Sequence, residues 1–161
     1  QTCVNARSHP REDMIAKHEI PRALRAAYLA MHRRCEARFA HFGVTADQFV
    51  LLATLARGHA LTQRELARRM PSDPSTVRAM LVLMEREGLV ERDTHPTDAR
   101  ARTVALTPAG RRKFRQLWKA GESIRAKMYR SLEPHEAETL VGLLARVGRA
   151  LDVEPVRAGV P

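Results

Sequence analysis

Two short helix-forming segments with only three residues between them constrain the fold of this 161-residue chain more than any other feature. The first, residues 62–70, opens with a Thr-x-x-Glu capping box and is stopped by Pro71. The second has Asp73 as its N-cap and Pro74 in its first turn, and Gly88 closes it. Two helices joined by such a tight turn predict a helix-turn-helix unit.

The hydrophobic period changes directly after this unit. Two β-prone runs, LVERD at 89–93 and RTVAL at 102–106, are separated by the turn-rich stretch THPTDARA. This pattern predicts a β-hairpin. A hairpin that follows the second helix of such a unit is a wing, so we expect a winged helix-turn-helix.

Two helices are predicted before the winged unit. The first runs from Ile20, with Pro21 in its first turn, to Gly43. The second, residues 45–58, is opened by a Thr-x-x-Gln capping box. Apolar residues recur at steps of three and four, which predicts one buried face on each helix. These residues are Leu24, Tyr28, Met31, Cys35, Phe39, Phe42, Phe49, Leu52, Leu55 and Ala56.

Two more helices are predicted after the wing, one capped by Thr107 and one following Pro134. Their apolar faces hold Phe114, Leu117, Trp118, Ile124, Met128, Ala137, Leu140, Val141, Leu144, Val147 and Leu151. The ends, residues 1–16 and 153–161, are expected to be loose arms. The expected fold class is mainly α with a small β wing: about six helices plus a β-hairpin.

Composition favours a polyanionic partner. The chain has 28 Lys and Arg against 18 Asp and Glu, a net charge of +10 and a pI near 10.9, which suits nucleic acid or an acidic membrane face. Only seven aromatic residues (4 Phe, 2 Tyr, 1 Trp) are present, too few to favour a stacking platform for single strands.

Other classes of protein are disfavoured by what the sequence lacks. The longest uncharged apolar run, residues 48–56, is far shorter than the roughly 20 residues of a membrane span. The first residues have no signal-peptide core, so we expect a cytoplasmic protein, and a chain starting with Gln is expected to have lost its natural beginning. Cys3 and Cys35 are interpreted as thiols. There is no Gly-rich phosphate loop, His-Glu-x-x-His or nucleophile elbow, so neither an enzyme nor a cofactor is expected.

Several short motifs between residues 61 and 110 carry a family resemblance when taken together. They are ELA at 65–67, Ser75-Thr76-Val77, Glu85-x-x-Gly88-Leu89-Val90-x-Arg92, Asp98-x-Arg100 and Leu106-Thr107-x-x-Gly110. This region resembles the core of the MarR (multiple antibiotic resistance regulator) family of winged-helix transcription factors. The order of elements extends the resemblance over about residues 17–152.

The resemblance implies one domain over residues 1–161, with a DNA-binding lobe at 45–106 and dimerisation helices at 17–42 and 107–152. The apolar faces of the outer helices have no third layer to cover them, which independently favours a two-fold homodimer. Dimerisation would set two DNA-reading helices about one DNA turn apart, so a pseudo-palindromic operator is expected.

The second helix of the helix-turn-helix presents a candidate DNA-reading face. Burying Val77, Leu81 and Met84 leaves Ser75, Arg78, Ala79 and Val82 on the opposite side. Arg78 can reach guanine bidentately and Ala79 can meet a thymine methyl; a phosphate contact or a solvated charge is the alternative for Arg78. Ser75 and Thr76, and Gln63 and Arg64 on the preceding helix, are expected on the phosphate backbone.

The wing carries the sharper part of the resemblance. It implies that Arg100 enters the minor groove, that Asp98 pairs with it or shapes the turn, and that Arg102 contacts a phosphate. A charged, solvated hairpin is the alternative. Two departures, Ala99 where the family is usually basic and Val82-Leu83 where it is usually polar, predict fewer phosphate contacts or a different operator. The predicted DNA-binding set is therefore Gln63, Arg64, Ser75, Thr76, Arg78, Ala79, Asp98, Arg100 and Arg102.

Members of this family commonly bind a small effector between the dimerisation helices and the DNA-binding lobe. The expected lining here is Arg25, Tyr28, His32, Phe49, Leu52 and Trp118, which suits a small aromatic or phenolic acid that releases a repressor from DNA. Core packing is the alternative for the aromatic residues.

Three other functions remain open. The first is redox control through a reactive cysteine; Cys35 lies near the end of its helix, which does not favour this role. His32 and Cys35 have an i, i+3 spacing, but further metal ligands cannot be named, so no metal site is predicted. A non-specific architectural DNA-binding protein would share the charge and differ in its specificity ratio.

Overall fold

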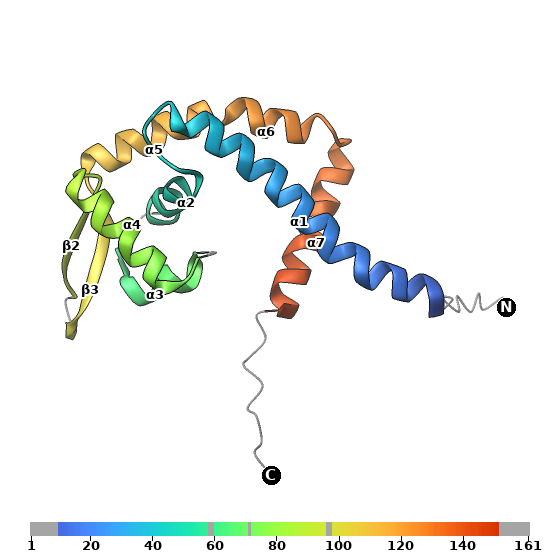
Figure 1. The fold of residues 1–161 in the computed structure, drawn as a ribbon, viewed down its shortest axis with the longest axis horizontal. Coiled ribbons are helices and arrows are strands. Elements are labelled where there is room, and N and C mark those ends of the chain that lie inside the picture. The colour runs from blue at the N-terminus through green and yellow to red at the C-terminus, as the bar shows by residue number, and fades with distance from the viewer. Residues whose placement is uncertain (1–9, 58–59, 71, 96–97, 152–161) are drawn as a thin grey trace, which may run out of the picture. The chain divides into compact units, whose positions relative to one another are not determined.

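The computed structural model describes residues 10–57, 60–70, 72–95 and 98–151; within these, the side chains of residues 10–16, 95 and 98–101 are not described. The expected arms at residues 1–9 and 153–161 lie outside the described ranges. The elements follow in the order α1 (Pro10–Ala40), α2 (Ala46–Leu55), β1 (Leu61–Thr62), α3 (Gln63–Arg69), α4 (Pro74–Arg86), β2 (Val90–His95), β3 (Asp98–Leu106), α5 (Pro108–Ala120), α6 (Glu122–Tyr129) and α7 (Pro134–Leu151) (Figure 1).

The helix α1 begins earlier than predicted. It starts at Pro10, so the predictions of a start at Ile20 and of a loose arm over residues 10–16 are wrong. Pro21 lies in the helix interior, where its ring removes the hydrogen bond to the carbonyl of Lys17. Residues 17–28 are exposed, and water can therefore supply the missing donor. The predicted end is confirmed, because Gly43 adopts a φ of +69°, a region that favours glycine.

The predicted caps set the starts of the other helices in this part of the chain. Thr45 with Gln48 and Thr62 with Glu65 each form a complete capping box. Asp73 caps α4 through the backbone amides of Ser75 and Thr76. The helix-turn-helix and the predicted hairpin are therefore confirmed.

Two further elements differ from the sequence prediction. A short strand, β1, pairs with β3 and makes the wing a three-stranded antiparallel sheet in the order β1-β3-β2. The single helix predicted across residues 108–128 is two helices, with buried Gly121 as the C-cap of α5. Glycine weakens a helix interior, and the apolar period continues across the break, so periodicity alone did not reveal it.

The chain forms two compact units, one up to Gly121 and one from Glu122. The first unit buries a continuous core. Its fully buried side chains are Phe39, Leu51, Leu52, Leu66, Leu81, Met84, Leu117, Val77, Val90 and Val104. The second unit contains α6 and α7, and none of their residues is buried. Nowhere in the described ranges is a helix both long and apolar enough to cross a bilayer.

Candidate nucleic-acid interface

The helix α4 has the two faces that its sequence predicts. Val77, Leu81 and Met84 are completely buried against the core. On the other side, Ser75, Arg78 and Ala79 are exposed. Val82 is only partly exposed, whereas its neighbour Leu83 keeps 45% of its surface accessible. The free face of α4 therefore offers the guanidinium of Arg78, two small side chains and an apolar edge.

The N-terminus of α4 is occupied by the carboxylate of Asp73. Asp73 accepts hydrogen bonds from the hydroxyl of Ser75, from the hydroxyl of Thr76 at 2.6 Å, and from the amides of Ser75 and Thr76 at 2.9 and 3.0 Å. The hydroxyl donors of Ser75 and then Thr76 are the largest causes that hold the pKa of Asp73 well below its usual range. Both hydroxyl hydrogens predicted to reach a DNA phosphate are therefore donated within the protein.

A groove lies beside this helix start. Its lining is formed by Gln63, Arg64, Ala67, Arg68 and Pro74, and its volume is about 520 Å³. Gln63 and Arg64 were selected from the sequence, but Arg68 was not. The missed signal is the i, i+4 spacing of Arg64 and Arg68, which places both on one side of α3.

The wing is formed by β2 and β3, which pair antiparallel with a register irregularity between Thr94 and His95. Arg102 is exposed and lies opposite Thr94. The backbones of Asp98, Ala99 and Arg100 belong to β3; their side chains lie outside the described ones, so their predicted contacts stay predictions.

An ion pair joins the end of α4 to the wing. The Nε atom of Arg92 on β2 lies 3.1 Å from Oε2 of Glu85 on α4, with 18% of the Arg92 side chain exposed. The Nε and Nη2 atoms of Arg92 are buried without a hydrogen bond of good geometry among the described residues. The Glu85 carboxylate is therefore the main compensation for this buried cation.

Hydrogen bonds and close packing join the base of the wing to the start of α5. The hydroxyl of Thr107 donates to the carbonyl of Gly88 at 2.6 Å and accepts from the amide of Gly110 at 3.0 Å. A Cβ atom on Gly110 would lie 1.9 Å from the carbonyl oxygen of Leu89. Only glycine allows α5 to approach the backbone this closely.

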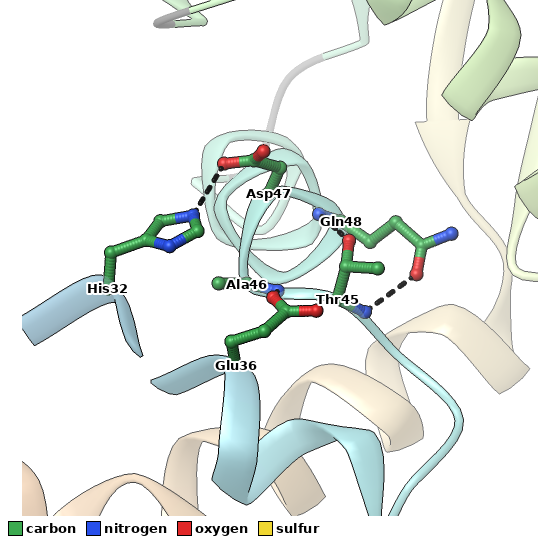
Figure 2. A network of polar contacts seen from close by, with 6 residues as sticks. All are labelled: His32, Glu36, Thr45, Ala46, Asp47 and Gln48. Atoms are coloured by element: carbon green, nitrogen blue, oxygen red, sulfur yellow. Dashed lines mark hydrogen bonds and ion pairs between the residues drawn. The ribbon is translucent and has the colours of Figure 1, made fainter. Parts of the chain in front are cut away.

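The residues predicted to bind an effector fall into two groups. Nε2 of His32 lies 3.3 Å from Oδ1 of Asp47, and its ring lies 5.6 Å from that of Tyr28. Figure 2 shows the side chains of His32 and Glu36 on α1 directed at the start of α2, where Glu36 accepts from the amide of Ala46 at 2.6 Å. Exposed Arg25 precedes them on α1.

The other predicted effector residues belong to the aromatic core and to α5. Phe49 packs between Phe39 and Phe114, at ring-centroid distances of 4.6 and 6.1 Å. Leu52 is completely buried and is not open to a ligand in this structure. Trp118 is half exposed and lines a hollow of about 310 Å³ with Phe114 and Arg115.

Features for the redox and metal alternatives are sparse. Cys35 is partly buried and packs against the core, while Cys3 lies outside the described residues. Within the described ranges, no group of three or more His, Cys, Asp or Glu side chains is placed to hold a metal ion.

Taken together, α2, α3, α4 and the three-stranded sheet define a winged helix-turn-helix protein. Residues 42–101 match the family model described as "MarR family". The chain is 33% identical over 107 residues to a putative transcriptional regulatory protein for the hcr operon of Thauera aromatica, a match covering 66% of this chain and 64% of that protein. This chain therefore matches slightly less than two thirds of that relative's length.

Solved structures agree with this class. A mutant of MarR from E. coli complexed with operator DNA superposes with a TM-score of 0.73 at 25% identity, covering 87% of this chain and 99% of that chain. BpsR of Bordetella bronchiseptica, whose DNA binding is described as regulated by 6-hydroxynicotinic acid, gives a TM-score of 0.73 at 26% identity, covering 84% and 94%. The winged helix-turn-helix region, residues 42–101, therefore matches the MarR family, and the chain is similar to solved MarR structures over most of its length.

Proposed function

We propose that this protein is a sequence-specific, DNA-binding transcriptional regulator that acts as a homodimer on a pseudo-palindromic operator. The observation that carries the proposal is the division of α4 into a fully buried face and a face that exposes Arg78 and Ala79 beside a basic groove. The net charge of +10 suits a double-stranded DNA partner. The similarity to MarR of E. coli bound to operator DNA supports the same partner.

In this proposal the residues of the lobe at 45–106 divide into two roles. Arg78 and Ala79 read bases in the major groove, and Arg100, positioned by Asp98, enters the minor groove. Gln63, Arg64 and Arg102 contact the backbone. Ser75 and Thr76 would have to release Asp73 before their hydroxyls could donate to a phosphate.

The exposed apolar residues of the outer helices support the homodimer. On α7, Leu140, Leu143 and Leu144 are 42–44% exposed, and Val141 is 68% exposed. On α1, Ile20, Leu24 and Tyr28 are also exposed. A second copy would remove these surfaces from water, with dimerisation segments at residues 17–42 and 107–152.

We further propose that the protein is a repressor released by a small aromatic or phenolic acid. Arg25, Tyr28 and His32 on α1 offer positive, aromatic and hydrogen-bonding groups for such a ligand. The BpsR similarity supports a ligand of this chemical class. Redox or metal control and non-specific architectural binding are the alternatives.

The deciding experiment compares affinities for two duplexes. DNA upstream of the protein's own gene is footprinted, and binding to the protected duplex and to a random-sequence duplex is measured at one stated salt concentration. A regulator is expected to prefer its operator by about 10³-fold or more. Equal affinities would favour the architectural alternative. Transcription from the same template then separates repression from activation.

A further inference from the structure

The α4 N-terminus and the groove beside it differ in charge. The helix start, where a DNA phosphate would profit from the helix dipole, already holds the carboxylate of Asp73 with four donors turned towards it. A phosphate brought to this point would meet a fixed negative charge. Asp73 is ionised at neutral pH, and the donors that lower its pKa favour this charged form further.

The groove between α3 and α4 has the opposite character. Arg64 and Arg68 contribute to its lining and are both exposed. Neither arginine takes part in an ion pair with a carboxylate in the described part of the chain. Two uncompensated guanidinium groups one helical turn apart are suited to a phosphate, which accepts their planar donors.

We propose that the groove between α3 and α4 receives one backbone phosphate of the bound duplex, held by Arg64 and Arg68, and that the N-terminus of α4 does not. The inference rests on the proposed DNA binding and names the part of the surface that contacts the backbone. Arg68 is its new member. The contact is independent of base sequence, because every nucleotide presents the same phosphate.

The test uses Arg68 and its neighbour Arg69 as a matched pair. Both are exposed arginines in the last turn of α3, but only Arg68 lines the groove. The full chain and the variants Arg68→Gln and Arg69→Gln are titrated with the operator and with a random duplex between about 50 and 200 mM salt. We expect Arg68→Gln to reduce the magnitude of the slope of log affinity against log salt by up to about 0.9 for each subunit, or about 1.8 for the bound dimer, equally on both duplexes. Arg69→Gln should leave the slope unchanged.

A second comparison locates the phosphate. Ser75→Ala and Thr76→Val remove the two hydroxyls while the Asp73 cap keeps its backbone donors, and both should retain the wild-type slope. A slope that falls in Thr76→Val but not in Arg68→Gln would overturn the inference by placing the phosphate at the helix start. Equal losses for Arg68→Gln and Arg69→Gln would overturn it as well, since they would indicate only diffuse charge.

These outcomes are separate from those of the proposed function. If the wild-type protein binds operator and random duplex equally, sequence-specific regulation fails, yet the slopes measured on the random duplex still decide whether the groove holds a phosphate. If the operator is preferred and Arg68→Gln changes no slope, the groove inference fails alone.

Discussion

At the scale of single residues, Arg78 is the side chain on which the proposed recognition of DNA bases depends most. It is exposed on the free face of α4 and has no carboxylate partner in the described ion pairs. We expect Arg78→Ala to weaken operator binding by about 1 to 3 kcal/mol and to relax the preference at one operator position. Competition with operators substituted at single positions measures this. A uniform loss on every duplex would assign Arg78 to a phosphate.

Gly110 gives a residue-scale prediction for stability. An added Cβ atom would lie 1.9 Å from the Leu89 carbonyl oxygen, so Gly110→Ala must force α5 away from the wing base. We expect a loss of about 3 kcal/mol of unfolding free energy, the upper part of the usual range for overpacking. Denaturant unfolding measures it.

Gly142 on α7 is the matched control, because nothing lies within 4 Å of its added Cβ. There Gly142→Ala should leave the unfolding free energy unchanged or raise it by about 0.5 to 1 kcal/mol. If both variants are equally stable, the close approach at Gly110 is not as the structure describes it.

At the scale of elements, caps and periodicity predicted most of the fold. The capping residues at Thr45, Thr62 and Asp73 mark helix starts because each satisfies amides that have no partner inside the helix. The start of α1 was missed because Pro21 was interpreted as a first-turn residue. The strand β1 was missed because two residues carry no period of their own and depend on pairing with β3.

Helical periodicity also made part of the candidate site predictable. Periodicity identifies which face of α4 is free, and this part is confirmed by the burial of Val77. It does not show which partner a hydroxyl chooses, and Ser75 and Thr76 bond Asp73. Nor does it show the groove at Arg68, which exists only once α3 and α4 are placed against each other.

The contact between α4 and the wing gives the element-scale prediction. Glu85→Gln removes the charge opposite the mostly buried Arg92. Because Glu85 is partly exposed, we expect a loss of about 1 to 2 kcal/mol, less than for a fully buried pair. The double variant Glu85→Gln with Arg92→Met should recover part of this loss. Additive losses in the double variant would show that the two side chains are not coupled.

At the scale of the whole molecule, effector control requires two states of the dimer that differ in DNA affinity. If a ligand weakens DNA binding by about 1 to 3 kcal/mol, DNA must weaken the binding of that ligand by the same free energy. We expect one or more acids from a panel of phenolic and benzoic acids to shift the operator titration, and His32→Ala and Arg25→Ala to reduce the shift. A shift that survives both substitutions unchanged would place the ligand elsewhere, and an inactive panel would direct attention to redox and metal control.

The homodimer gives the last prediction. Burying the apolar residues of α7 against a second copy would contribute on the order of 1.5 kcal/mol for each well-covered side chain. Val141, 68% exposed in the single chain, is therefore a sensitive position. Val141→Asp would place a charge in the proposed interface, and we expect it to produce a monomer in sedimentation at micromolar concentration and to weaken operator binding together with dimerisation.

The control for this experiment is Arg146→Gln. It changes the net charge by the same amount as Val141→Asp, and Arg146 lies away from the apolar face of α7 by helical periodicity. We expect Arg146→Gln to remain a dimer. A dimer engages both half-sites of one operator and gains avidity from the second contact. A monomeric Val141→Asp variant loses only this gain and should still bind a half-site at high concentration. A wild-type chain that sediments as a monomer, or a Val141→Asp variant that stays dimeric, would contradict the assignment of α7 to the dimer interface.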